Sequence, residues 1–485
     1  MNYKMVVKTL GKVFILEAFM LAIPMVVGFI YQENSYMDYL LPIGLLLILG
    51  LPTFLLRAKD KSIYTKEGFV IVSLAWILMS VFGAIPFVLN GAIPSYIDAL
   101  FETVSGFTTT GSTIISDIEI LDKSILFWRA LTHWLGGMGV LVFVLALTPG
   151  YNSGAMHVLR AESPGPTVGK LVSKLSFTAR ILYAIYVGLT VLLVVFLLIG
   201  GMSLYDSLVH AFSTAGTGGF SIKNQSIAAY NSAYLEIVIA VFMFIFGINF
   251  NVFYLILIGN VKKALKSEEL RAYFFIVVTA TIIIAINILS IGFNFGEALR
   301  YSFFQVTSIS STTGFVSANF DGWPALSKAI LIVLTIIGAS GGSTGGGMKV
   351  SRIAILCKSV ISDIKRMLHP RAVVSVKFEG ELLDKQTEKN VYSYFILWVL
   401  IVAVCTVLLC LDIDDFLVNF TATITCISNV GPGLSNAGLQ MVGPTYNFAL
   451  YSPFSKVLLS IVMLVGRLEV FPIILLFTPR TWKRG

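Results

Sequence analysis

The sequence has little charge, little cysteine and little histidine. Only 12% of its 485 residues are Asp, Glu, Lys or Arg, whereas 56% are hydrophobic and the mean hydropathy is +0.87. A soluble protein usually carries about twice that share of charged residues. The four cysteines and four histidines show no spacing typical of a disulfide framework, a metal site or a catalytic nucleophile with its base. The composition predicts a polytopic membrane protein and argues against an enzyme.

The net charge of +8 does not indicate a nucleic-acid partner, because the basic residues gather on one side of the expected membrane. If the N-terminus is cytoplasmic and successive spans alternate in direction, most of the 34 Lys and Arg residues fall in cytoplasmic segments. This bias follows the positive-inside rule. Residues 10–31 are too long for a cleavable signal and lack a small-residue cleavage site, so we expect a retained first span.

After two leading spans, at about 11–31 and 39–57, the sequence repeats one unit four times. Each unit has an outward apolar span, a half-length segment that ends in a glycine-containing loop, and an inward apolar span. These segments lie at 68–90, 97–113 and 124–148, at 178–201, 204–221 and 232–260, at 272–293, 297–316 and 325–357, and at 391–411, 414–433 and 454–478. The predicted fold class is an all-α membrane protein with four pseudo-symmetric repeats around one central pore. It would have about ten membrane-spanning helices and four re-entrant pore loops.

The expected divisions of the chain follow this repeat. They are 1–60 for the leading helices, 61–150, 151–262 and 263–365 for the first three repeats, 366–390 for a cytoplasmic connection, and 391–485 for the fourth repeat. The polar segment 349–390 carries both signs of charge and is expected to form short helices and a small hairpin. Its composition fits a plain surface loop and a docking site for a partner equally well.

Four short loops end the half-length segments: 109–113 (TTGST), 217–221 (TGGFS), 312–316 (TTGFV) and 429–433 (NVGPG). At membrane depth such irregular backbone is tolerated only inside protein or beside a water-filled path. Rings of backbone carbonyls can replace the water around K⁺, and glycine permits the positive φ that turns carbonyls toward one axis. The predicted K⁺ filter comprises Thr109, Thr110, Gly111, Thr217, Gly218, Gly219, Thr312, Thr313, Gly314, Asn429, Val430 and Gly431.

Each half-length segment also begins near an acid, at Asp98, Asp206, Glu297 and Asp415. Helix capping is the simpler interpretation of these acids, and attraction of cations to an outer mouth is the other.

A second glycine-rich stretch, 338–347 (GASGGSTGGG), lies inside the third inward span. Glycine costs about 1 kcal/mol relative to alanine within a helix, so this stretch should not be helical. It lacks the Gly-Lys-Ser/Thr ending of a P-loop, which predicts no nucleotide on this chain. We predict an unwound gate across the pore, with a kinked helix as the alternative. Its residues would be Gly338, Gly341, Gly342, Ser343, Thr344, Gly345, Gly346 and Gly347.

Three polar residues at membrane depth need a role. Arg467 lies near the middle of the last span, where an ionisable residue is costly. We expect it to bond to carbonyls of the glycine-rich stretch, with a structural tie between helices as the alternative. Arg129 lies nearer the external end of its span and could snorkel to the surface. His210 is expected to pack rather than to bind a ligand.

At these motifs the chain resembles the Trk/Ktr/HKT superfamily of potassium transporters, most closely its bacterial TrkH branch. Residues 105–113, 211–221, 311–315 and 429–434 match the four filter loops of that family, and 466–469 (GRLE) match its last helix. The resemblance implies a multi-pass protein of the bacterial inner membrane with a cytoplasmic N-terminus. It implies a homodimer with one pore per subunit, gated by the broken third-repeat helix and Arg467. It also implies a cytoplasmic partner, a TrkA-like ring of RCK domains, which would carry the nucleotide site.

The predicted function is the pore of a K⁺ uptake system that passes K⁺, Rb⁺ and some Na⁺. All four loops keep their glycine, which favours K⁺ selectivity by similarity to the family, although Val316 stands where relatives often have Ser or Thr. The alternative is a secondary active symporter that couples K⁺ to H⁺ or Na⁺. We expect few buried carboxylates along the inner spans, which favours the passive pore.

Overall fold

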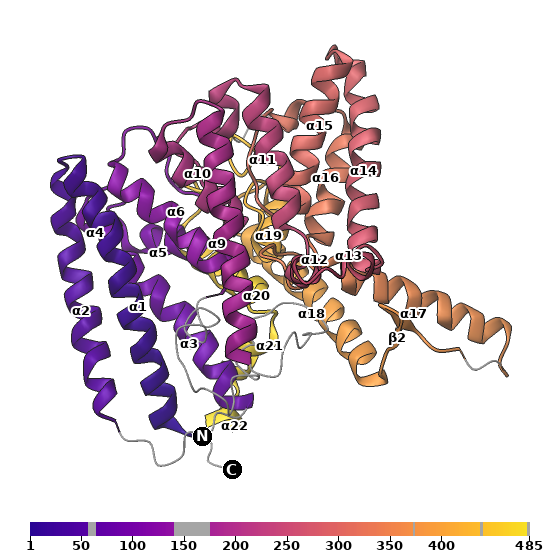
Figure 1. The fold of residues 1–485 in the computed structure, drawn as a ribbon, viewed down its shortest axis with the longest axis horizontal. Helices are drawn as coiled ribbons and strands as arrows, with labels where there is room; N and C mark the ends of the chain where they lie inside the picture. Colours follow the sequence, from indigo (N-terminus) through magenta and orange to yellow (C-terminus); the bar gives the residue numbers. More distant parts are fainter. Residues whose placement is uncertain (57–64, 140–174, 372–373, 437–439, 483–485) are drawn as a thin grey trace.

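The computed structural model describes residues 1–56, 65–139, 175–371, 374–436 and 440–482 of the chain. Over these residues the chain is mostly helical, and the helices stand side by side in one bundle (Figure 1). Outward-facing apolar side chains are exposed on α2 (Leu40–Gly50), α9 (Leu175–Ile199), α14 (Glu268–Ile288) and α18 (Lys385–Leu409), whereas many Ser and Thr side chains are buried inside the bundle. This is the reverse of a soluble protein and suits a bundle surrounded by lipid. The predicted fold class is confirmed.

Two leading helices precede the first repeat, as predicted. They are α1 (Tyr3–Ile30) and α2 (Leu40–Gly50), joined and extended by the short 3₁₀ helices η1 (Asn34–Tyr39) and η2 (Leu51–Leu55). Asn2 begins α1 by accepting a hydrogen bond from the backbone N–H of Met5 at 3.3 Å. α1 packs along both α2 and α3, so the leading pair is part of the bundle.

The four repeats supply the remaining helices. The first has α3 (Thr65–Gly83), α4 (Ile85–Leu89), α5 (Tyr96–Phe107) and α6 (Lys123–Gly137). The second has α9 (Leu175–Ile199), α10 (Leu204–Gly216), η3 (Ser226–Tyr230), α11 (Ala233–Phe246), α12 (Phe250–Leu257) and α13 (Val261–Leu265). The third has α14 (Glu268–Ile288), η4 (Leu289–Ile291), α15 (Phe295–Ser310), η5 (Phe320–Gly322), α16 (Ala325–Ile337) and α17 (Val350–Leu368). The fourth has α18 (Lys385–Leu409), α19 (Phe416–Ser428), α20 (Pro453–Arg467), α21 (Phe471–Phe477) and α22 (Pro479–Trp482).

Six helical segments of the described chain are long and apolar enough to cross a membrane, and two bent helix pairs bring the number to eight. The two other predicted spans are 124–148, described only to residue 139, and 325–357, which contains the short helix α16. The predicted inward spans at 232–260 and 454–478 correspond to these two bent pairs. The chain turns by 91° between α11 and α12 and by 120° between α20 and α21.

The half-length helices α5, α10, α15 and α19 begin with side-chain caps. Ser95 and Ser203 accept hydrogen bonds from the backbone of Asp98 and Asp206, and Asn294 forms a reciprocal capping box with Glu297. In α19 the acid itself, Asp415, accepts from the backbone N–H of Val418 at 2.9 Å. All four acids therefore lie at or within three residues of a helix start, where a negative charge is favourable. The capping interpretation is sufficient for them.

The polar segment 349–390 forms the predicted small hairpin, but one 19-residue helix, α17, stands where short helices were expected. α17 extends away from the bundle and is followed by β1 (Lys377–Phe378), which pairs antiparallel with β2 (Glu381–Leu382) (Figure 1). Ile355 of α17, Phe378 of the hairpin and Val391 of α18 form a small apolar cluster that holds these elements together.

Candidate functional site

The four predicted filter loops share one backbone conformation. In each loop the first residue is left-handed, with φ of 56° at Thr109, 55° at Thr217, 62° at Thr312 and 55° at Asn429. The glycine two positions later is left-handed as well, with φ of 82° at Gly111, 78° at Gly219, 83° at Gly314 and 97° at Gly431. Both features end the preceding helix in the manner of a Schellman cap and turn the chain back on itself.

The hydrogen bonds that end each half-length helix are equivalent too. The N–H of the second residue of each loop donates to the carbonyl five residues earlier, at 2.8–2.9 Å. The pairs are Thr110 with Ser105, Gly218 with Ser213, Thr313 with Ser308, and Val430 with Thr425. All four loops therefore leave their half-length helices with the same pattern of hydrogen bonds.

The loops form a closed ring in chain order. A Cβ atom at Gly111 would lie 2.0 Å from the carbonyl oxygen of Gly218, and one at Gly219 would lie 2.1 Å from that of Thr313. The ring continues from Gly314 to the oxygen of Val430 at 2.0 Å, and closes from Gly431 to that of Thr110 at 2.7 Å. No real Cβ fits at such distances, so glycine is required both by its φ and by the approach of the next loop.

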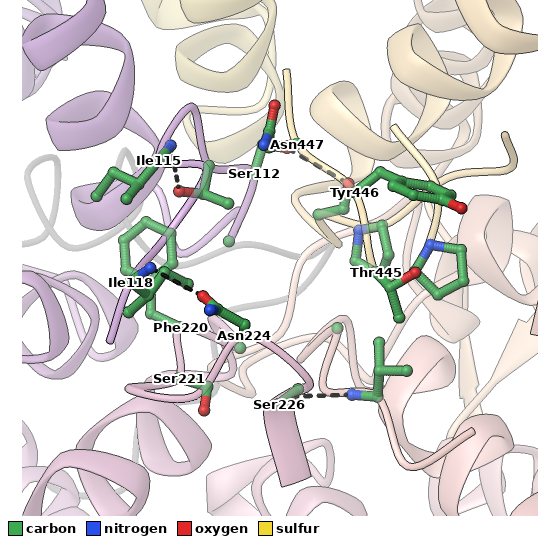
Figure 2. A pocket seen from close by; sticks show the side chains of 18 of the residues that line it. Ser112, Ile115, Ile118, Phe220, Ser221, Asn224, Ser226, Thr445, Tyr446 and Asn447 are labelled. Carbon is green, nitrogen blue, oxygen red and sulfur yellow. Dashed lines mark hydrogen bonds between the residues drawn. The ribbon is translucent and has the colours of Figure 1, made fainter. Parts of the chain in front are cut away.

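A cavity of about 110 Å³ lies against one side of the ring (Figure 2). All four ring glycines line it, together with the residues that follow them in the chain. Ser112, Asn224, Ser226 and Tyr446 surround it with polar groups (Figure 2). Asn224 is held by a 2.8 Å hydrogen bond from the backbone N–H of Ile118. An ion in this cavity would meet hydroxyl, amide and carbonyl oxygens before it met the ring.

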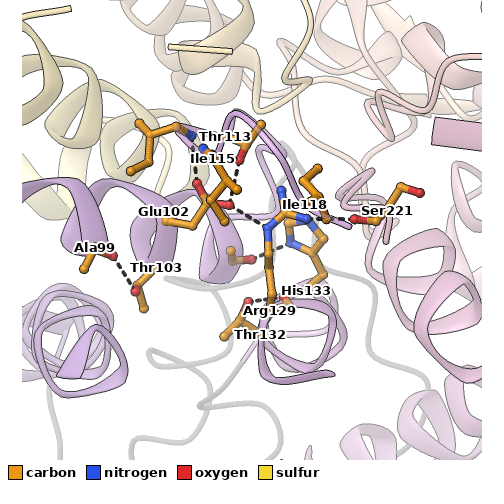
Figure 3. A network of polar contacts seen from close by, with 12 residues as sticks. Ala99, Glu102, Thr103, Thr113, Ile115, Ile118, Arg129, Thr132, His133 and Ser221 are labelled. Atoms are coloured by element: carbon orange, nitrogen blue, oxygen red, sulfur yellow. Dashed lines mark hydrogen bonds and ion pairs between the residues drawn. The ribbon is translucent and has the colours of Figure 1, made fainter. Parts of the chain in front are cut away.

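A buried ion pair braces the first and second loops (Figure 3). Glu102 of α5 accepts from Arg129 Nε of α6 at 2.6 Å, and both side chains are at most 2% exposed. Glu102 also accepts from Thr113 Oγ1 and from the N–H of Ile114, both at 2.9 Å. Arg129 donates in turn to the carbonyl of Ser221 at 2.9 Å. The suggestion that Arg129 snorkels to the surface is wrong, because its charge is neutralised inside the protein.

An acidic side chain also ties the third repeat to the fourth. Asp321, after the third loop, accepts from the backbone N–H of Ser435 at 3.2 Å and from its hydroxyl. Burial raises the pKa of the Asp321 carboxyl, while the bonds from Ser435 and the charge of Lys328 lower it. Asn429 of the fourth loop donates to Thr110 Oγ1 at 2.9 Å and so joins the fourth loop to the first.

The glycine-rich loop, residues 338–349, lies against the side of the ring where the filter loops adjoin their half-length helices. Helix α16 stops at Ile337 and α17 starts at Val350, so the intervening residues do not form the kinked helix that was the alternative. The N–H of Gly346 donates to Thr312 Oγ1 at 2.6 Å. A Cβ at Gly346 would lie 2.3 Å from the carbonyl oxygen of Ser428. The glycine-rich loop therefore touches the first residue of the third filter loop and the residue that precedes the fourth.

Arg467 joins this loop to the first repeat. Its Nη1 donates to the carbonyl of Thr344 at 2.8 Å, and its Nη2 donates to the carbonyls of Gly137, at 2.7 Å, and Gly136. Arg467 thus makes both contacts that the sequence left open, one to the glycine-rich loop and one between helices. Gly136 in turn lies directly against the backbone carbonyl of Phe107, the last residue of α5.

Sequence reasoning missed several buried charged groups. Glu17, Glu102, Glu236 and Glu269 are each at most 5% exposed, and only Glu236 lies in one of the inward spans, where few buried carboxylates were expected. The signal for Glu102 was present, since an acid and Arg129 both lie at membrane depth in neighbouring helices. Glu269 gave no such signal, because it stands in a charged turn that is typical of solvated chain. His210 packs as expected, with Nδ1 2.8 Å from the carbonyl of Asp206.

Comparison with known proteins agrees with this geometry. The family model of TrkH, described as a cation transport protein, matches residues 43–484. The chain belongs to the TrkH family. It is 33% identical to the Trk system potassium uptake protein TrkH of Escherichia coli strain K12 and 31% identical to that of Halomonas elongata, over the full length of each. The crystal structure of the potassium transporter TrkH from Vibrio parahaemolyticus superimposes with a TM-score of 0.89 at 31% identity, with both chains fully covered. The TrkH family resemblance read from the loops is confirmed.

Proposed function

We propose that this chain forms the pore of a K⁺ uptake system and passes K⁺, Rb⁺ and some Na⁺ through the ring of four loops. The closed ring supports this most directly, because each glycine touches the carbonyl oxygen of the next loop. Loops so arranged bring main-chain oxygens from four sides to one axis, as needed to replace the hydration shell of an alkali cation. The names of the relatives, potassium uptake proteins, point to the same cation.

We further propose that the glycine-rich loop and Arg467 form the gate. The loop touches Thr312 of the third filter loop and Ser428 at the end of α19, and Arg467 links it to the end of α6 in the first repeat. Glycine residues leave this segment free to change conformation at low cost. The relatives are named as parts of a Trk system, which fits control by a cytoplasmic TrkA-like ring that binds the nucleotide.

We propose a homodimer in the bacterial inner membrane, with a cytoplasmic N-terminus and lipid around the bundle. The part of α17 that extends from the bundle carries exposed apolar side chains at Val360, Ile361, Ile364, Met367 and Leu368. A helix of this kind is stabilised by covering its apolar side, and a second copy of α17 provides a matching surface.

A coupled symporter is the second candidate, and one observation favours it. Both carboxylate oxygens of Glu17, in α1, are buried without a hydrogen-bond partner in the described chain. An isolated carboxyl group inside a membrane protein is expected to be protonated and is typical of a proton site. The other buried glutamates of the described chain, Glu67, Glu102, Glu236 and Glu269, are each paired with a cation or with backbone amides.

Ion flux through the purified protein tests the proposal. Vesicles containing the full-length chain should take up Rb⁺, and an excess of external K⁺ should block this uptake better than Na⁺ or Li⁺. Uptake should follow the K⁺ gradient alone, with or without a pH gradient, and Glu17→Gln should leave it unchanged. Uptake that a pH gradient drives, and that Glu17→Gln abolishes, would establish the symporter instead.

A further inference from the structure

The carboxylate of Glu269 bonds to the glycine-rich loop and to the start of the helix that follows it. Glu269 is the second residue of α14 and is 5% exposed. Its Oε1 accepts from the backbone N–H of Gly341 at 2.7 Å and from that of Ser351 at 3.1 Å. Gly341 lies early in the loop, and Ser351 lies in the first turn of α17. One oxygen atom of Glu269 therefore joins the loop to the helix that follows it.

The two backbone N–H groups that donate to Glu269 have few other hydrogen-bond acceptors. Ser351 lies in the first turn of α17, where backbone N–H groups have no partner within the helix. Gly341 lies in irregular chain with no regular ladder of hydrogen bonds. A carboxylate satisfies both donors, and its negative charge is favourable at a helix N-terminus. The local structure therefore depends on an acid at this position.

The bend between α11 and α12 holds the same loop from another side. The N–H of Ser340 donates to the carbonyl of Gly247 at 3.1 Å, and the N–H of Phe250 donates to that of Gly342 at 3.0 Å. Asn249, between them, reaches Oε2 of Glu269 at 3.5 Å. Glu269 is thus the point at which the bend, the loop and α17 meet.

The hairpin formed by β1 and β2 contacts the start of α14. Glu379, in its turn, accepts from Ser267 Oγ at 2.8 Å and from the N–H of Glu269 at 3.0 Å. Lys358 of α17 bonds to the carboxylate of Glu268 and to the carbonyl of Lys377 at 2.9 Å. The backbone of Glu269 is therefore bonded to the exposed hairpin, and its side chain is bonded to the glycine-rich loop.

We propose that Glu269 is a positioning residue that latches the glycine-rich loop against the ring, and that Glu379 of the hairpin sets the position of this latch. A partner that moves the exposed hairpin displaces the start of α14, weakens the bonds from Glu269 and frees the loop. This inference rests on the proposed gating role of the loop. It names the route by which regulation at the surface reaches that gate.

Rb⁺ uptake into vesicles that contain the purified full-length chain, without any partner, tests the latch. Glu269→Ala should raise basal uptake several-fold, because the loop loses both bonds. Glu269→Gln should raise it less, since an amide oxygen still accepts hydrogen bonds. The ratio of Rb⁺ to Na⁺ uptake should stay as in the natural chain, because the ring is untouched. Glu236→Gln is the matched control: Glu236 is equally buried but pairs with Arg300 at 3.1 Å, away from the loop. It should leave basal uptake unchanged.

The hairpin is tested in the same assay. Glu379→Ala should raise basal uptake in the same direction, and the double variant with Glu269→Ala should exceed Glu269→Ala alone by little, because both act through one contact. Glu381→Ala removes an exposed carboxylate from the same hairpin and should have no effect. Fully additive effects of Glu269→Ala and Glu379→Ala would overturn the route through the hairpin.

The outcomes separate this inference from the function on which it rests. If the natural chain takes up no Rb⁺, the pore and the latch both fail. If it takes up Rb⁺ but Glu269→Ala and Glu379→Ala behave like the natural chain, the latch alone fails. If Glu269→Ala does not fold, the exposed Glu379→Ala decides, and its unchanged basal uptake would overturn the proposal.

Discussion

At the scale of single residues, the ring glycines are fixed by two independent constraints. Gly219 has φ of 78°, and a Cβ there would lie 2.1 Å from the carbonyl oxygen of Thr313. The first constraint strains the backbone of any other residue. The second moves a carbonyl of the neighbouring loop, and that carbonyl lines the ion path that we propose.

Gly219→Ser should therefore weaken discrimination against Na⁺, because the third loop must move outward and the ring oxygens no longer match K⁺. Competition of Na⁺ with Rb⁺ uptake measures this. Gly201→Ser is the matched control, since Gly201 also has a positive φ, of 87°, but nothing lies within 4 Å of its Cβ position. It should lose about 1 kcal/mol of stability and keep the selectivity. Equal selectivity in both variants would contradict the role of the ring.

The buried pair of Glu102 and Arg129 should be important for stability as well as for the outer loops. Arg129→Leu leaves a buried carboxylate without its cation, which costs about 3–5 kcal/mol. We expect a clear loss of thermal stability in detergent and weaker K⁺ selectivity. Lys223→Ala breaks the exposed pair with Glu119, at 3.0 Å in the same region, and should cost no more than about 1 kcal/mol. Similar melting temperatures for the two variants would rule out this role.

At the scale of the elements, the sequence predicts the helices better than their interruptions. The break at 338–349 was predictable, because six glycines in ten residues disfavour a helix. The bends at residues 247–249 and 468–470 were not, because a single polar residue in each, Asn249 or Glu469, does not by itself end a helix. These bends are set by tertiary hydrogen bonds, such as that of Phe250 to Gly342, which no local pattern encodes. Two arginines also make contacts between residues far apart in the sequence: Arg467 bonds to Thr344, and Arg352 pairs with Glu469.

Shortening the glycine-rich loop should open the pore. Deletion of residues 343–346 removes the bond between Gly346 and Thr312 and the acceptor of Arg467 at Thr344. Basal Rb⁺ uptake should rise, since the remaining chain is too short to reach the ring. The ratio of Rb⁺ to Na⁺ uptake in the same vesicles is the internal control and should not change. A deletion variant that is folded yet closed would refute the gate.

At the scale of the whole molecule, α17 has an exposed apolar side that a second copy would cover. Ile364→Glu combined with Met367→Glu should convert a dimer in detergent into monomers, because like charges would face each other across the contact. Light scattering coupled to size exclusion gives the mass. Lys365→Glu places the same charge at a polar position of the same helix and should leave the dimer intact. A dimer that survives the double substitution would place the interface elsewhere.

Most of the overall fold could be predicted from the sequence, but the candidate site could be predicted only in part. Four glycine loops at similar intervals were enough to predict four repeats around one pore. Their order around the ring, and the ties through Glu102, Asp321 and Asn429, depend on contacts between residues more than 20 positions apart. Glu269 was hidden for another reason, because a turn of charged residues has the same composition whether water or protein covers it.

The ring is built from one polypeptide rather than from four identical subunits. In a symmetric tetramer one mutation in the filter changes all four subunits together, so selection acts only on the fourfold change. Here each quarter can change alone, as Val430 and Pro432 have in the fourth loop, where the others carry no proline. A cation pathway encoded in a single gene can therefore adjust its preference one side at a time, in smaller evolutionary steps than a fourfold assembly allows.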